Sequence, residues 1–178
     1  VGYEYYFDGD RMFTLFVPTN DCLTEADVDS LTEVYNAQKS NRIKNNDNTV
    51  IKQVLQNHMA MYNYAAIASG DSVQMMMLNG KYSYLADGGV NGVKYLSSNM
   101  LYRNGVLFTV GSRLPYFANV SEYFTMDDEL DSIASFFSRY NVYEFDASRS
   151  VPGEIVDGKT VYLDSVMNLK NVMFDELG

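Results

Sequence analysis

The single histidine, His58, has the widest range of chemistry in this sequence, because imidazole can serve as a base or a metal ligand near neutral pH. A serine nucleophile paired with a histidine often lies in a Gly-x-Ser-x-Gly turn, and the sequence contains no such turn. A zinc site would need further His or Cys ligands, and Cys22 is the only cysteine. His58 lies among apolar residues at helical spacing, near Leu55 and Met59, which favours a hydrogen-bonded structural role. We therefore expect no enzymatic activity, no metal and no cofactor.

Carboxylates are the other groups that could do chemistry, and they occur in two short clusters. Asp8 and Asp10 flank a glycine, as in a turn, and residues 127–129 precede a helical pattern, where negative charge suits a helix N-terminus. Neither cluster matches the twelve-residue calcium loop with its Gly and final Glu. The alternative function that the residues leave open is a small-ligand-binding or hydrolytic cleft beside His58.

The net charge of −10 argues against nucleic acid or anionic lipid as a partner. The charge is unevenly distributed. Residues 1–116 carry 9 basic and 11 acidic side chains, whereas residues 117–178 carry 4 and 12. This difference predicts a domain boundary near residue 117.

The elements that must position these side chains are mostly short strands. Residues 90–115 predict a β-meander, with turns at Asn91-Gly92 and Asn104-Gly105 where both residues tolerate positive φ. The apolar run Met12–Val17 predicts a buried strand that ends at Pro18. A further hairpin is expected over residues 73–85, with Met75 and Met77 on one face and Met76 on the other.

Helices are expected on both sides of the predicted boundary. Thr19, Asn20 or Asp21 is expected to cap a helix whose apolar stripe runs through residues 27–38, and a second helix is expected over residues 50–59. Beyond residue 116 we expect helices over residues 119–123, 130–140 and 165–177. A polar loop over residues 145–158 and a short strand at 161–163 complete the prediction.

Three segments of the chain resemble the motifs of a fasciclin domain, in the order found in that family. FTLFVPTNDCL at residues 13–23 resembles the opening motif, and Val90–Pro115 resembles the closing motif with its Val-Asn-Gly turn, Asn-Gly-Val and Leu-Pro. His58 lies where the middle motif has its Tyr-His pair. The resemblance covers about residues 11–116 and implies an α+β fold, a wedge-shaped β-sandwich of short strands flanked by helices. The matching positions are Pro18, Thr19, Asn20, His58, Asn91, Gly92, Asn104, Gly105 and Pro115.

The same resemblance gives an expectation for the domain organisation. Residues 1–116 resemble a fasciclin domain that lacks its N-terminal helices, and residues 117–178 form an acidic segment, expected to be helical, that resembles the start of a following domain. This segment either packs back on the first domain or exchanges with a neighbouring chain, which would give a homo-oligomer, or it is a truncated second domain. The expected protein is a bacterial tandem fasciclin protein at the cell surface or in the periplasm, lipid-anchored upstream of Val1.

The resemblance implies a non-enzymatic adhesion module that contacts a protein or glycan partner, with a structural spacer as the other reading. The sequence contains 15 Tyr, more than a small core needs, and a tyrosine ring gives broad contact area at low entropy cost. Animal members of the family are associated with integrin binding through an Asp-Ile pair, but Asn99-Met100 stands there, so that activity is not expected. The residues expected to line the binding surface are Tyr82, Tyr84, Tyr95 and Tyr102.

Overall fold

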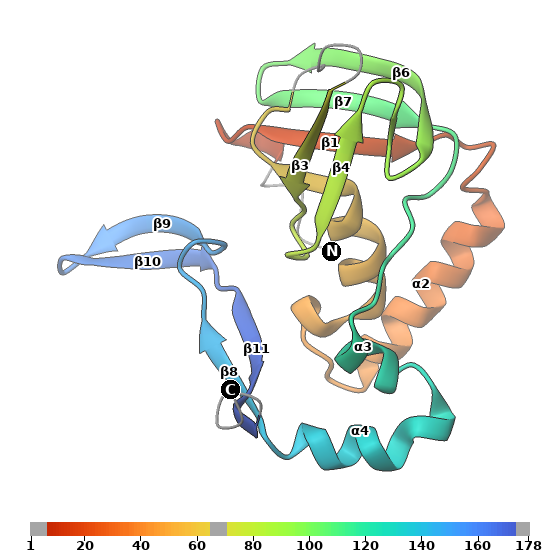
Figure 1. Cartoon of the computed structure of the whole chain (residues 1–178). Coiled ribbons are helices and arrows are strands. Elements are labelled where there is room, and N and C mark those ends of the chain that lie inside the picture. The colour runs from red at the N-terminus through yellow and green to blue at the C-terminus, as the bar shows by residue number, and fades with distance from the viewer. Residues whose placement is uncertain (1–6, 65–70, 174–178) are drawn as a thin grey trace. The chain divides into compact units, whose positions relative to one another are not determined.

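The computed structural model describes residues 7–64 and 71–173 (Figure 1). Its contacts divide the chain into two compact units, Val1–Tyr116 (unit 1) and Phe117–Gly178 (unit 2). Among the residues that the structure describes, none of the helices combines the length and the apolar character needed to cross a membrane.

Unit 1 is built on one seven-stranded sheet, as expected for an α+β fold, in the order β2-β1-β7-β6-β5-β4-β3. β1 runs parallel to β7, and the other neighbouring strands are antiparallel. The sheet folds over on itself, so that β3 and β4 lie across β1 and β7 (Figure 1). An isolated bridge between Ala60 and Met77 links its two ends. The strands are β1 Phe13–Pro18, β2 Met59–Met61, β3 Ser72–Met76, β4 Tyr82–Ala86, β5 Gly89–Val90, β6 Val93–Tyr102 and β7 Gly105–Val110.

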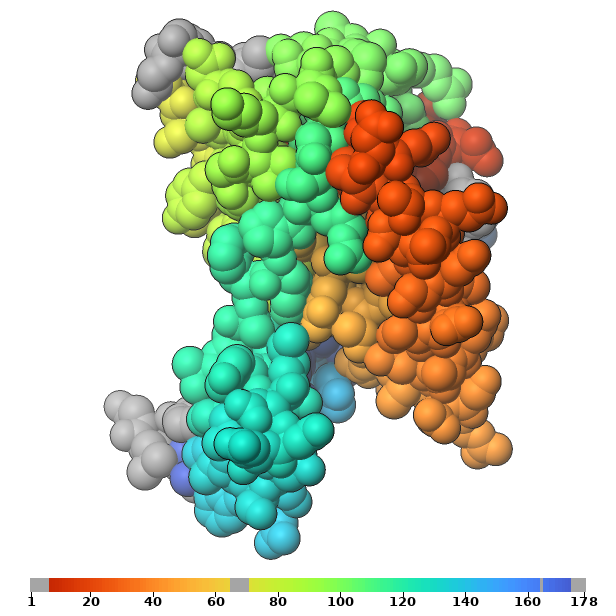
Figure 2. All heavy atoms as spheres, turned by 90° about the vertical axis from the view of Figure 1, so that its right-hand side faces the viewer, coloured from red at the N-terminus to blue at the C-terminus, as the bar shows by residue number. Residues whose placement is uncertain are grey.

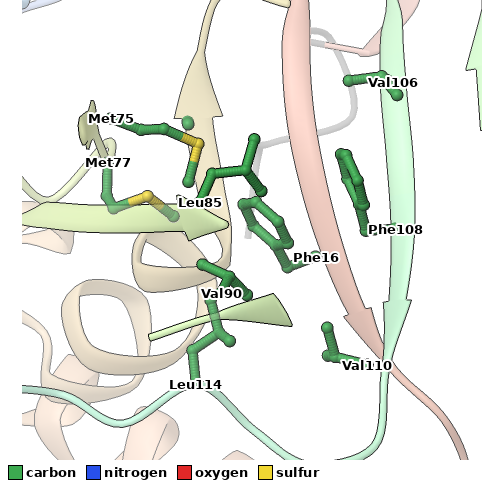
Figure 3. Packing of buried hydrophobic residues seen from close by; sticks show 10 residues of the cluster. Phe16, Met75, Met77, Leu85, Val90, Val106, Phe108, Val110 and Leu114 are labelled. Carbon is green, nitrogen blue, oxygen red and sulfur yellow. The ribbon is translucent and has the colours of Figure 1, made fainter. Parts of the chain in front are cut away.

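The core of unit 1 lies between the two halves of this folded sheet (Figure 3). Phe16 of β1 and Phe108 of β7 stack with ring centroids 5.3 Å apart. Met75 and Met77 are fully buried while Met76 is half-buried, which confirms the predicted alternation. The buried cluster comprises Phe16, Ala60, Met75, Met77, Leu85, Val90, Val106, Phe108, Val110 and Leu114.

The first helix begins later than the sequence predicted. α2 spans Glu25–Ser40, and Thr24 caps it in a capping box with Asp27. The expected cap at residues 19–21 is wrong, because the Thr19 carbonyl accepts the N–H groups of Cys22 and Leu23 and so closes a separate turn. None of the residues of α2 is buried, and the helix, in orange, lies on the surface of unit 1 (Figure 2).

The second helix is shorter and less regular than predicted. A 3₁₀ turn at Asn45–Asp47 leads to a π-helical turn at Ile51–Leu55 and a 3₁₀ turn at Gln56–His58. Met59 does not extend the helix, because it begins β2 and pairs with Leu15 of β1.

One of the two predicted Asn-Gly turns has the expected geometry. Asn91 and Gly92 both have positive φ, at 49° and 81°, and connect β5 to β6. Asn104-Gly105 differs, since Gly105 pairs with Tyr102 as the first residue of β7. Gly105 is needed for another reason, because a Cβ there would lie 2.2 Å from the Phe13 carbonyl oxygen of β1.

Unit 2 begins with short helices and continues as two antiparallel strand pairs, the hairpin of β9 with β10 and the pair of β8 with β11, which flank that hairpin in sequence. Asn119 caps α3, and Asp127 accepts the Glu129 N–H at the start of the following 3₁₀ turn, which confirms that residues 127–129 act as a cap. The elements are α3 Val120–Phe124, the 3₁₀ turn Asp128–Leu130, α4 Asp131–Ser138, β8 Asn141–Phe145, β9 Val151–Val156, β10 Lys159–Asp164 and β11 Met167–Asn171.

Two predictions for unit 2 are wrong. The expected loop over 145–158 contains β9, and the expected helix over 165–177 contains β11, with its last residues, 174–178, lying outside the described part of the chain. β11 pairs with β8 in unbroken register, from Met167 opposite Phe145 to Asn171 opposite Asn141. This long-range pairing outweighs the local helical spacing of the apolar residues.

Unit 2 buries little of its apolar surface. Within its described residues only Ser150 and Val151 are buried, and the side chains of Ile155 and Leu163 are 74% and 65% exposed. Small sheets of two strands are marginally stable in water unless a further layer covers them. Unit 2 therefore has less of a core of its own than unit 1.

A fragment of residues 1–116 is expected to unfold cooperatively, because every member of the buried cluster lies between residues 16 and 114. A fragment of residues 117–178 is expected to show no cooperative transition. Circular dichroism during heating of both fragments measures this. Aggregation of the 1–116 fragment would contradict it and would favour the prediction that the C-terminal segment completes the first domain.

Candidate functional site

Both ring nitrogens of His58 have partners within unit 1. The backbone N–H of Leu114 donates to Nε2 at 2.9 Å, so Nδ1 carries the proton and donates to the Val54 carbonyl oxygen at 2.7 Å. The side chain is buried, with His58 only 7% exposed. His58 thus joins the turn before β2 to the segment that follows β7.

The neighbouring residue, Asn57, extends this connection. Its Nδ2 donates to the carbonyl oxygens of Leu114 and Pro115, each at 3.2 Å. Its Oδ1 accepts a hydrogen bond from Asn79 Nδ2 at 3.0 Å, which connects Asn57 to the turn between β3 and β4. We call Asn57, His58 and Asn79 the polar clamp, since together they connect three segments that are distant in sequence.

The polar clamp gives His58 a structural role. Burial lowers the pKa of His58 below its usual value, more than the hydrogen bond to Val54 raises it, so the ring is neutral at physiological pH. A general base needs a free nitrogen lone pair facing a substrate, and the Nε2 lone pair already accepts the Leu114 N–H. The alternative of a hydrolytic cleft beside His58 therefore has no support in this geometry.

Tyr82 and Tyr84 lie on the outward face of β4, 60% and 56% exposed, while Ser83 and Leu85 between and after them are buried. Tyr84 is held in place, because Gln74 Nε2 of β3 donates to its hydroxyl at 3.1 Å. Its backbone N–H donates to Asn91 Oδ1 at 2.8 Å. We call Tyr82, Tyr84 and Gln74 the tyrosine face.

Tyr95 does not belong to an exposed surface, contrary to the prediction from sequence. Its ring packs on Phe108 with centroids 4.9 Å apart, and its hydroxyl donates to the carbonyl oxygens of Gly89 at 2.7 Å and Ala86 at 3.2 Å. Burial, assisted by the nearby charge of Asp87, raises the pKa of Tyr95 to about 12. Its hydroxyl therefore fixes the β4–β5 loop.

The variant Tyr95→Phe is expected to lose about 1–2 kcal/mol of unfolding free energy, because two backbone carbonyls lose their donor while the ring packing remains. Chemical denaturation measures the change. Tyr84→Phe is the matched control, since its hydroxyl is exposed to water, and it should change stability by less than about 0.5 kcal/mol. Equal losses in the two variants would contradict the structural role of Tyr95.

Tyr102 is exposed but lies apart from the tyrosine face. It is at the end of β6, eight residues after Lys94, which pairs with β5, and this separation corresponds to roughly 25 Å of strand. There it borders an apolar groove of about 290 Å³ with Phe7, Leu15 and Leu107. The four predicted tyrosines therefore occupy three different environments.

Comparison with protein-family models relates the chain to a known family. The family model described as Fasciclin domain matches residues 2–115. The chain belongs to the fasciclin domain family. Domains of this family are generally non-enzymatic adhesion or binding modules and are typically extracellular or at the cell surface. No curated protein sequence matches the chain.

Within this fasciclin domain, several of the motif positions hold neighbouring segments of the chain together. Pro18 ends β1 opposite Val110, and the Thr19 N–H continues the ladder to the Val110 carbonyl. Asn20 is exposed, and Asn104 Nδ2 donates to the Phe7 carbonyl.

Several residues important to the fasciclin domain escaped the sequence analysis. Asn79 and Gln74 lie within the hairpin that was predicted over residues 73–85, but no side-chain role was predicted for either of them. Asn91 was predicted for its φ angle, yet its side chain also donates to the Ser83 hydroxyl at 2.9 Å. An Asn in a turn is a signal for such side-chain bonding, but the partner depends on which strands the fold brings together.

Proposed function

We propose that this fasciclin domain is a non-enzymatic adhesion module that binds a protein or glycan at the cell surface through the tyrosine face. The observation that supports this most is the pair of exposed rings at Tyr82 and Tyr84, two residues apart on one face of β4. Rings in this arrangement offer a flat apolar surface on which a sugar ring or a partner's side chain can stack.

The polar groups beside the rings suit the same role. Gln74 lies opposite Tyr84 in the β3–β4 ladder, and Met76 lies opposite Tyr82. The Gln74 amide and the two phenol hydroxyls can exchange hydrogen bonds with a glycan or a polar peptide, and the Met76 side chain is half-buried beside them. The negative charge of the chain disfavours an acidic partner.

The setting that we propose for this module is a bacterial surface or periplasmic protein with tandem fasciclin domains and a lipid anchor upstream of the observed sequence. The family's usual extracellular or surface location supports the surface assignment. Segment exchange through residues 117–178 remains part of the proposal, because the exposed apolar side chains of unit 2 are suited to covering by another segment.

Binding of the 178-residue protein to an array of immobilised glycans and extracellular-matrix proteins tests the proposal. We expect a saturable signal that falls at least about tenfold in the double variant Tyr82→Ala/Tyr84→Ala, since two stacking rings are removed. Tyr102→Ala is the matched control, because it removes an equally exposed strand tyrosine outside the tyrosine face. A signal lost only in Tyr102→Ala, or an array with no signal, would contradict the proposal.

A further inference from the structure

A short sequence pattern, aspartate followed by serine and an aliphatic residue, recurs in both units of the chain. Four of the 15 aspartates are followed directly by serine, although serine makes up only 15 of the 178 residues. In all four cases the next residue is leucine, valine or isoleucine. The four copies are Asp29-Ser30-Leu31, Asp71-Ser72-Val73, Asp131-Ser132-Ile133 and Asp164-Ser165-Val166.

The four copies lie in different kinds of structure. Ser30 is inside α2, Ser72 is the first residue of β3, Ser132 is the second residue of α4, and Ser165 lies between β10 and β11. Of the four aspartates only Asp131 lies in the first turn of a helix, where its negative charge is stabilising. A capping or turn requirement would place the pattern at one kind of position. Local structure therefore does not account for the recurrence.

The four serines share exposure to solvent. Each of them is exposed, whereas the two buried serines, Ser83 and Ser150, follow a tyrosine and an arginine. A serine hydroxyl is a nucleophile once a base removes its proton. The aspartate before it and the aliphatic residue after it offer an enzyme one charged and one apolar contact beside that hydroxyl. The pattern is therefore suited to recognition by a modifying enzyme.

The surroundings of these serines favour a sugar over a phosphoryl group as the addition. Each phosphate would add about −1.5 to −2 charges next to a carboxylate, in a chain whose net charge is already −10. A glycan is bulky and polar, so it can shield exposed apolar side chains. Ile133, next to Ser132, is 39% exposed, and Leu163, two residues before Ser165, is 65% exposed. A glycan also fits the extracellular or surface location that is typical of this family.

We propose that Ser30, Ser72, Ser132 and Ser165 are sites of O-glycosylation by a transferase that recognises the Asp-Ser-aliphatic pattern. The donor is a sugar linked through its anomeric carbon to a diphosphate carrier. The serine oxygen forms a bond to that carbon, the bond from the carbon to the phosphate oxygen breaks, and the diphosphate leaves with the electron pair. The hydroxyl proton passes to a base of the transferase. This proposal does not rest on the tyrosine face.

Mass spectrometry of peptides from the protein, purified from the cells that produce it naturally, tests the proposal. We expect the peptides that contain the four serines to be heavier by whole sugar residues, with fragmentation placing the sugar on the serine oxygen. Ser98 and Ser112 are the controls, because both are exposed and neither follows an aspartate. Unmodified peptides, phosphate in place of sugar, or sugar on the control serines to the same extent would overturn the proposal.

One substitution makes the test specific to the pattern. Asp71→Asn keeps the shape of the side chain and removes its charge, so we expect at least about tenfold less sugar on Ser72 and no change at Ser132. Asp87→Asn is the matched control, since Asp87 is an exposed aspartate that precedes a glycine, and all four serines should keep their sugar. Both variants would be produced in the same cells as the natural protein. Unchanged sugar on Ser72 in Asp71→Asn, or an equal loss in Asp87→Asn, would overturn the proposal.

Discussion

The variant Gly105→Ala is expected to lose at least about 3 kcal/mol of unfolding free energy, one of the largest single losses in unit 1. A Cβ at this position would lie 2.2 Å from the Phe13 carbonyl oxygen and 3.1 Å from two further backbone atoms of Phe13. Backbone atoms in a paired strand cannot move aside as a flexible side chain can. The central β1–β7 pair would have to separate locally to admit the methyl group.

Gly111→Ala is the matched control for this prediction. A Cβ at Gly111 would meet only the end of the Leu96 side chain, at 3.7 Å, which is an ordinary contact. We expect a change within about 0.5 kcal/mol, since no strain arises and the unfolded chain loses some freedom. Chemical denaturation of both variants gives the comparison, and a similar effect in the two would show that β1 does not approach β7 as closely as described.

The variant His58→Ala is expected to lose about 2–4 kcal/mol of unfolding free energy, because the Leu114 N–H and the Val54 carbonyl both lose their hydrogen-bond partner in a buried site. His58→Gln keeps an acceptor at the Nε2 position, so we expect an intermediate loss. Denaturation at pH 8 measures both, and equal losses in the two variants would contradict the role of Nε2 as acceptor.

The same histidine predicts how stability depends on pH. Its pKa is lowered in the folded protein by burial, so between the ordinary value of 6.5 and the folded value the unfolded chain binds a proton that the folded chain does not. The unfolding free energy therefore has its full value above about pH 7. It decreases as the pH drops toward 5, by at most about 1.4 kcal/mol per pH unit. His58→Gln removes the only histidine and should flatten this dependence. An unchanged slope in that variant would contradict the prediction.

Local patterns predicted much of unit 1 because its strands and turns have local causes. The Asn91-Gly92 turn depends on residues that tolerate positive φ, and the burial of Met75 and Met77 depends on the two-residue period of a strand. The requirement for Gly105 is different, since it arises from the approach of Phe13, which is 92 positions earlier in the chain. A sequence pattern can mark such a glycine but cannot supply its reason.

The directions in which side chains point from a strand, and the pairing of strands distant in sequence, were harder to predict. β6 has register shifts on both sides of Ser97, so simple alternation cannot assign the directions of Tyr95 and Asn99. The helical spacing of apolar residues that predicted a helix over 165–177 overlaps β11, yet β11 pairs with β8, about 25 residues away. The candidate tyrosines were therefore found by residue type, whereas their division into exposed and packed rings needed the fold.

Ring signals of the tyrosines provide the most direct test of the central claim, that binding takes place on the tyrosine face while the clamp histidine is structural. The 178-residue protein would carry ¹³C-labelled tyrosine and histidine rings and would be titrated with a ligand captured on the array. We predict that the Tyr82 and Tyr84 signals shift at saturation while those of Tyr95 and His58 stay in place. Shifts confined to His58 or Tyr95, with Tyr82 and Tyr84 unchanged, would contradict the account and place the ligand elsewhere in the domain.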